Sequence, residues 1–156
     1  MSKEKYILVI ADGSKEMEVA LQYACARSKK TNRKIIIAAF VEPLDVLTTQ
    51  GVTEIMQNEA REEAEKNLQY AASIVKESTG FMPVLQIREG EIMKELKNLI
   101  NEEKNINVLV ISANVDEKKN PGPIINALVS KELSNFRVPV MIVPGNFSKD
   151  HITLLT

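Results

Sequence analysis

The sequence predicts an α/β fold in which a parallel five-stranded sheet lies between two layers of helices. Five short apolar runs rich in β-branched residues are typical of strands, and four longer segments with helical spacing of apolar residues separate them. Alternating strands and helices form parallel sheets with right-handed crossovers, and their helices cover both faces. We therefore expect a three-layer sandwich built on one sheet.

The first two strands are expected at 6–11 and 34–41. Both are continuous apolar runs without alternation, which is the pattern of strands buried on both faces. A helix is expected between them over 15–28, because its apolar residues recur at the spacing of one helix face. Gly13 is expected to allow the tight turn out of the first strand, and Ser14 to cap the helix that follows.

The rest of the chain continues the alternation. Thr79-Gly80 is expected to end a long helix, since glycine often follows a helix. The fourth helix is marked by apolar residues at Ile124, Ile125, Leu128, Val129 and Phe136. The remaining strands are expected at 84–87, 107–112 and 139–143, and the remaining helices at 52–77, from Gly90 onward, and at 124–136.

Length and composition fit one globular domain. Of the 156 residues, 44% are apolar and 26% charged, and the formal net charge of -1 gives no positive field that would attract nucleic acid or a membrane surface. The single cysteine, Cys25, fits a reducing compartment, and no apolar run approaches the roughly 20 residues that span a bilayer. We expect a cytoplasmic protein with one domain at 1–145 and a tail at 146–156 that packs or is disordered.

The carboxyl ends of the strands are the expected place for a ligand. In open parallel sheets, ligands bind beyond these ends, near the point where the strand order reverses. Asp12-Gly13-Ser14 follows the first strand there, and the loops at 42–51 and 113–123 follow two others. The Asp12 carboxylate can accept hydrogen bonds from an adenine amino group or a ribose hydroxyl, or satisfy amides of its own turn. The position alone leaves both roles open.

The motifs of several enzyme classes are absent from the sequence. The dinucleotide pattern G-x-G-x-x-G and the P-loop are both missing, because Gly13 stands alone. The only histidine, His151, lies in the tail, so no Ser-His or Cys-His pair is expected. One cysteine and one histidine do not form a zinc site of the usual composition. Cys25 lies on the apolar helix face, as a core residue would. We expect neither catalysis nor a metal site.

Five segments of the chain form an ordered set: ILVIADGSKEMEVALQYA (7–24), IIIAAFVEP (35–43), REGEIMKELKNLI (88–100), NVLVIS (107–112) and VPVMIVP (138–144). Together, over about 5–144, they resemble the universal stress protein family. No single segment decides the resemblance, and Asn107 stands where the family usually has Asp.

The resemblance implies a Rossmann-like sheet with strand order 3-2-1-4-5. It also implies a homodimer across the edge formed by the fifth strand, where Val138, Val140 and Ile142 are the candidate contact residues. Pairing with a symmetry mate satisfies the hydrogen bonds that an edge strand leaves open, so the implied dimer is physically sensible.

The family's phosphate-binding motif is degraded in this chain. Members that bind ATP carry Gly-x2-Gly-x9-Gly-Ser/Thr between the fourth strand and the fourth helix. Here Ser112 and Val115 fall at the first two glycine positions, and Asn126 and Ala127 at the third glycine and the hydroxyl. The only glycine of this stretch, Gly122, lies between two prolines, which have no amide to donate.

The resemblance therefore implies a remnant nucleotide pocket with its base side and without its phosphate side. Asp12 and Val41 match the base side. We expect no tightly bound ATP or other cofactor, and a role in stress response through an unidentified protein partner. One alternative is a nucleotide-binding switch in which Lys118 or Lys119 replaces the glycine amides. Another is an enzyme on a related scaffold, which would need a catalytic constellation that the sequence does not present.

Overall fold

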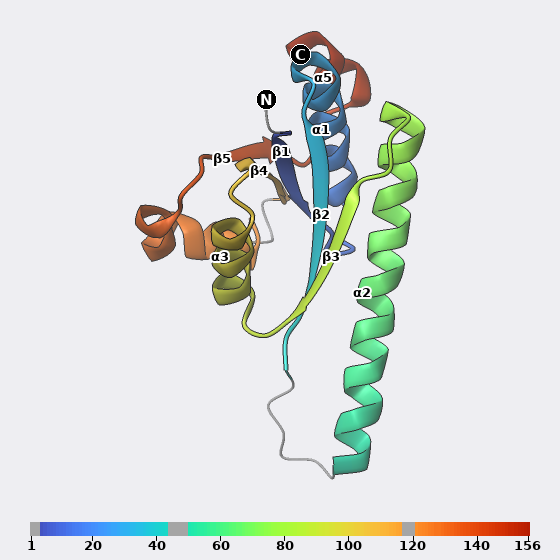
Figure 1. Cartoon of the computed structure of the whole chain (residues 1–156), viewed down its shortest axis with the longest axis vertical. Coiled ribbons are helices and arrows are strands. Elements are labelled where there is room, and N and C mark those ends of the chain that lie inside the picture. Colours follow the sequence, from blue (N-terminus) through green and yellow to red (C-terminus); the bar gives the residue numbers. More distant parts are fainter. Residues whose placement is uncertain (1–3, 44–49, 117–120) are drawn as a thin grey trace.

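The computed structural model describes residues 4–43, 50–116 and 121–156 and contains one parallel sheet with helices on both faces (Figure 1). The strand order is β3-β2-β1-β4-β5 and every pairing is parallel, as the alternation and the resemblance imply. The regular elements are β1 (Tyr6–Ile10), α1 (Met17–Thr31), β2 (Lys34–Val41), α2 (Gln50–Thr79), β3 (Val84–Glu89), α3 (Ile92–Glu102), β4 (Ile106–Ala113), α4 (Pro123–Ala127), β5 (Val140–Pro144) and α5 (Lys149–Leu155).

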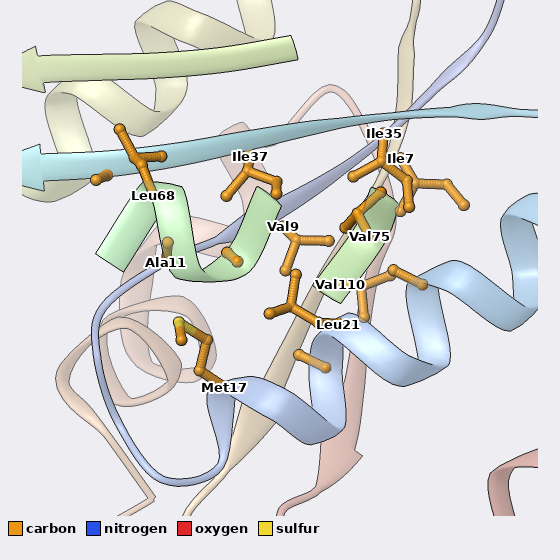
Figure 2. Close-up of a cluster of buried hydrophobic side chains, with 14 of the residues drawn as sticks. Ile7, Val9, Ala11, Met17, Leu21, Ile35, Ile37, Leu68, Val75 and Val110 are labelled. Carbon is orange, nitrogen blue, oxygen red and sulfur yellow. The ribbon is translucent and has the colours of Figure 1, made fainter. Parts of the chain in front are cut away.

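The continuous apolar strands supply both halves of the core. In β1, Ile7 and Val9 face α1 and α2, whereas Leu8 and Ile10 face α3 and α4. Successive side chains of a strand point to opposite faces, so a strand covered on both sides needs apolar residues at every position. Figure 2 shows the half under α1 and α2, where side chains from β1, β2 and β4 meet Leu21 of α1.

The first helix begins later than predicted. The prediction that Ser14 caps it is wrong, because α1 starts at Met17 and its N-cap is Glu16, which makes no side-chain cap bond. The Ser14 amide instead donates to Oδ1 of Asp12 at 2.9 Å, and the Ser14 carbonyl accepts the Met17 amide at 3.2 Å. Within the segment 11–16 that joins the strand to the helix, Asp12 closes a turn on the Ser14 amide.

The predicted fourth helix is divided into three short pieces. The α-helical part is α4; a π-helical turn over Leu128–Glu132 and a 3₁₀ turn over Leu133–Asn135 follow it. The π turn changes which residues face the sheet. Leu128 is buried as expected, but Val129 is 67% exposed, so its assignment to the apolar face is wrong.

The second helix extends beyond the sheet (Figure 1). Its second half packs on α1 and β2 through Leu68, Ala71 and Val75, whereas Val52 and Ile55 in its first half are exposed. Gly80 ends it as predicted, with φ +82° and its amide bonded to the Lys76 carbonyl. No helix in the described part of the chain is long and apolar enough to cross a membrane.

The C-terminal tail is an ordered helix that packs on α1, at the top of Figure 1. Ser148 is its N-cap and accepts the His151 amide at 3.1 Å. Ile152 is fully buried, and Phe147 packs against the core under α1 and α2. Of the two expected states of the tail, packing is therefore the one observed.

The outer edge of the sheet at β5 is only partly apolar. Val138 precedes the strand and is buried within one protomer, and Val140 packs against the core under α3 and α4. Met141 and Ile142 are exposed. Among the described strands, β5 pairs with β4 alone.

Candidate functional site

A cavity of about 210 Å³ lies at the carboxyl ends of β1 and β4. We call it the carboxyl-end cavity. Its walls come from the turn after β1, the first turns of α1, the end of β4 and the start of α4. Most of the lining is apolar. The lining residues are Ile10, Asp12, Ser14, Glu16, Met17, Ala20, Ile92, Ile111, Ser112, Pro121, Gly122, Pro123, Ile124 and Ile125.

Asp12 holds the turn that opens one wall of this cavity. One carboxylate oxygen accepts the Ser14 amide, which is the local bond expected of an aspartate in a turn. Gly13 lies at φ +75°, and a Cβ atom there would stand 2.7 Å from the Asn67 side chain. Glycine is therefore favoured here by the backbone conformation, whereas the Asn67 amide is the end of a flexible side chain and could move aside. Asp12 therefore satisfies an amide of its own turn, which is one of the two roles expected for it, and its side chain also borders the cavity.

Ser112 closes the wall between β4 and α1. Its hydroxyl donates to the Glu16 carbonyl, which also accepts the Val19 amide at 3.1 Å. The hydroxyl proton is thus committed to the protein, and the serine ties β4 to the first turn of α1. The Glu16 side chain lies on the same wall and adds a second carboxylate to that of Asp12.

A proline-flanked turn forms the remaining wall. Gly122 has φ +130°, a conformation that favours glycine, and its carbonyl accepts the Asn126 amide at 3.0 Å. Pro121 and Pro123 have no amide hydrogen, so two of the three residues of this turn offer no donor to an anion. The Pro121 carbonyl is tied to the other end of the loop by the Asn114 amide at 3.2 Å.

The charge of the carboxyl-end cavity is acidic. Asp12 and Glu16 are the only charged side chains among the described residues that line it. The N-terminus of α1 carries roughly half a positive charge, which two carboxylates outweigh. In the part of the chain that the structure describes, no group of three or more His, Cys, Asp and Glu side chains could hold a metal ion.

The comparison with known families is decisive for the fold. The sequence description of the Universal stress protein family matches residues 4–144. The chain belongs to the universal stress protein family. No curated protein sequence matches it.

Solved structures of other universal stress proteins share the fold at low identity. UspA from Lactobacillus plantarum superposes with a TM-score of 0.74 at 14% identity, covering 92% of this chain and 99% of that one. A universal stress protein in complex with cAMP gives 0.66 at 20% identity, covering 93% and 100%. One from Archaeoglobus fulgidus in complex with dAMP gives 0.61 at 14%, covering 92% and 99%. At these identities the likeness establishes the fold alone.

The structure brings together two of the five residues predicted for the nucleotide pocket. Asp12 and Ser112 border the carboxyl-end cavity. Val41 is buried under α1 and α2, and its carbonyl accepts the Gly90 amide at 2.9 Å. Asn126 is exposed on α4 and Ala127 is its last residue, and neither lines the cavity. Lys118 and Lys119 of the alternative reading lie outside the described residues.

The sequence interpretation missed Glu16 and Ile92 as lining residues. Ile92 reaches the site because α3 begins beside the carboxyl ends of the strands, as helices that follow a parallel strand do. Glu16 could have been found from the sequence, since the N-cap position of a helix after β1 must lie at that end of the sheet. The start of a helix after Gly90 gave the same signal for Ile92.

Proposed function

We propose that the protein is a non-enzymatic, cytoplasmic homodimer that acts in stress response through protein partners and does not bind ATP tightly. The observation that carries this proposal is the charge of the carboxyl-end cavity. A triphosphate needs cationic or amide donors, and the described lining offers two carboxylates and two prolines instead. The volume of about 210 Å³ also lies below the roughly 300–1,000 Å³ of typical small-molecule pockets.

Calorimetric titration with ATP and Mg²⁺ tests the proposal directly. The purified full chain is first checked for co-purified nucleotide by its absorbance and by chromatography after denaturation. We expect no bound nucleotide and no saturable heat up to millimolar ATP. A stoichiometric amount of co-purified ATP, or micromolar binding, would overturn the proposal.

A second candidate function is a switch that binds a less charged adenine nucleotide. It is favoured by the apolar part of the lining, which suits a base, and by the two relatives whose structures contain cAMP and dAMP. A single phosphate brings less charge toward Asp12 and Glu16 than a triphosphate does. Titration with AMP and cAMP separates the candidates: saturable binding of either, with none of ATP, supports the switch.

Lys118 and Lys119, in the loop at 113–123, provide the sharpest test of the alternative in which this loop binds the phosphates of a nucleotide. If Lys118 and Lys119 supply the phosphate contacts, changing both to Ala abolishes any nucleotide binding of the wild-type chain. Undiminished binding by the double variant would reject that arrangement. Asp12→Asn serves as the matched test of the base side, because it keeps the size of the side chain and removes its charge.

The proposed dimer forms across the β5 edge. Met141 and Ile142 are 42% and 40% exposed on a strand with one open side, and a two-fold axis would pair the edge with itself. Light scattering after gel filtration should give about twice the 17.4 kDa of one chain. Ile142→Lys should yield monomer, whereas Val129→Lys, at an exposed apolar residue elsewhere, should remain dimeric. A wild-type monomer at tens of micromolar would contradict the proposal.

A further inference from the structure

A second cavity, of about 220 Å³, lies at the opposite end of the sheet. We call it the amino-end cavity. Its lining residues come from the end of α1, the end of α2, the start of β2 and the segment that leads into β3. The remnant nucleotide motif lies at the other end of the sheet, so the chemistry of the amino-end cavity follows from its own lining residues.

The charge of the amino-end cavity is basic. Lys29, Arg33 and Lys34 line it, and no carboxylate does among the residues that the structure describes. None of the three forms a salt bridge with a carboxylate in the described part of the chain, where the ion pairs involve Arg61, Arg88 and Lys97. Arg33 and Lys34 are half-buried as whole side chains, and the cavity gathers their charges with that of Lys29 and with no carboxylate among the described lining residues. A cluster of like charges without a counter-charge favours the binding of an anion.

The helix ends do not account for this charge. Two helices, α1 and α2, end at the cavity, and each C-terminus carries roughly half a negative charge. One cation therefore balances both ends, and Lys29 in the last turn of α1 is placed to do so. Arg33 and Lys34 lie beyond the helix. The Ser28 carbonyl is already bonded to the Asn32 and Arg33 amides, so the terminus is capped by backbone.

An apolar rim stands beside the cations. Phe81 and Met82 line the cavity and are 61% and 60% exposed, although both are large apolar side chains. The Lys34 ammonium lies 3.9 Å from the centre of the Phe81 ring, which orients the ring against the basic wall. An exposed aromatic face next to unpaired cations can stack on a flat apolar group while the cations hold its charge.

We propose that the amino-end cavity binds a small anionic molecule that carries a planar apolar ring. The ring stacks on Phe81 and packs against Met82, and the anionic group lies between Arg33 and Lys29. Arg33 presents a planar fork of donors that suits a carboxylate or phosphate. The carboxyl-end cavity, with Asp12 and Glu16, repels the same ligand, so the two ends of the sheet differ in the charge that they accept.

Amide NMR of the ¹⁵N-labelled full chain tests this proposal with 2-naphthoate as the probe. The matched probe is 2-naphthalenemethanol, which has the same ring without the charge, and inorganic phosphate has charge without the ring. We expect saturable 1:1 shifts of amides at 28–35 and 79–85 with 2-naphthoate, and binding at least about tenfold weaker for each matched probe. Shifts that centre on Asp12 and Ser112, or no saturation at millimolar probe, would overturn the proposal.

Variants locate the binding groups. Arg33→Gln combined with Lys29→Gln should weaken 2-naphthoate binding about tenfold or more, because it removes the two proposed charge-assisted contacts. Phe81→Ser provides an independent test at an exposed side chain that the fold does not need. Lys94→Gln, at an exposed lysine of α3, is the control and should bind as the wild type does. Wild-type affinity in both test variants, with unchanged thermal unfolding, would refute the site.

Discussion

Gly145 provides a quantitative test of the packing beside the carboxyl-end cavity. It follows β5, and its amide donates to the Ala113 carbonyl at 2.8 Å, which ties the end of β5 to the end of β4. A Cβ atom at this position would stand 2.5 Å from that carbonyl oxygen and 2.7 Å from the Glu16 Cβ. Gly145→Ala is therefore expected to destabilise the fold through steric overlap alone.

The magnitude follows from the two distances. Ordinary contact begins at 3.4 Å, so the backbone of Ala113 has to move by about 0.9 Å, and neither neighbour is the end of a flexible side chain. Overpacking of this kind costs about 1–3 kcal/mol. For a chain of this size each kcal/mol lowers Tm by roughly 2–4 °C. Thermal unfolding followed by circular dichroism should therefore show a Tm lower by roughly 2–12 °C.

Gly51→Ala is the matched control. Gly51 lies in α2 at negative φ, and a Cβ atom there meets nothing within 4 Å. Alanine in a helix is preferred over glycine, so this variant is expected to be neutral or up to about 1 kcal/mol more stable. If Gly145→Ala unfolds at the wild-type temperature or above it, the close approach of β5, α1 and the end of β4 is wrong, and with it the shape of the cavity.

Three further predictions concern the tail, the thiol and an ion pair. Ile152→Ala should cost about 2–5 kcal/mol in urea unfolding, because it empties a buried site, whereas Leu154→Ala, at an exposed residue, should stay within about 0.5 kcal/mol. Burial raises the pKa of the Cys25 thiol, so a thiol reagent at pH 8 should label the native chain only as fast as it opens. The Arg88 guanidinium lowers the pKa of Glu102 in the folded chain. The ion pair therefore stabilises the fold at pH values above the unfolded-state pKa of Glu102, and this stabilisation is lost as the pH falls through the folded-state pKa. Glu102→Gln should lower Tm at pH 7, and the difference in Tm from the wild type should vanish in acid.

The elements of the sheet were predictable because their apolar residues are contiguous. The second strand was predicted with its observed bounds, and the four others within two residues of theirs at each end. The error at β3 has a physical cause, since the strand continues through Arg88 and Glu89, which are polar. At this sheet edge, ion pairs of Arg88 with Glu102 and of Glu89 with Arg61 take the place of burial. An apolar pattern does not detect them.

The order of the strands was not contained in the local pattern. Residue types show that β1 is buried on both faces, but they do not show that its neighbours are β2 and β4. That information came from the resemblance, whose strand order the structure confirms. The predicted Ser14 cap failed for a related reason, because residue types near a turn do not fix where the next helix begins. Asp12 closes a turn on the Ser14 amide, the Ser14 carbonyl accepts the Met17 amide, and the helix begins at Met17.

Of the residues assigned to the remnant nucleotide pocket, only those held by the sheet border the carboxyl-end cavity. Asp12 and Ser112 end neighbouring strands, so the parallel sheet fixes their separation and both border the cavity. Asn126 and Ala127 were assigned by counting back from the fifth strand, across a helix that the structure divides into α-helical, π-helical and 3₁₀ turns. The chain here turns at Gly122 and enters α4 at Pro123, which carries both residues away from the cavity.

The two ends of the sheet carry side-chain charges opposite to the helix dipoles that point at them. Helices of a parallel α/β fold begin near the carboxyl ends of the strands, where their positive ends attract anions. In this chain Asp12 and Glu16 stand at that end and cancel the attraction. At the other end, Lys29 offsets the negative ends of α1 and α2, and Arg33 and Lys34 reverse the sign. An anion is therefore attracted to the amino-end cavity, although the helix dipoles of this fold alone would repel it there. Two charge-reversing substitutions made together, Glu16→Lys and Arg33→Glu, should move the preferred binding of 2-naphthoate from the amino-end cavity to the carboxyl-end cavity.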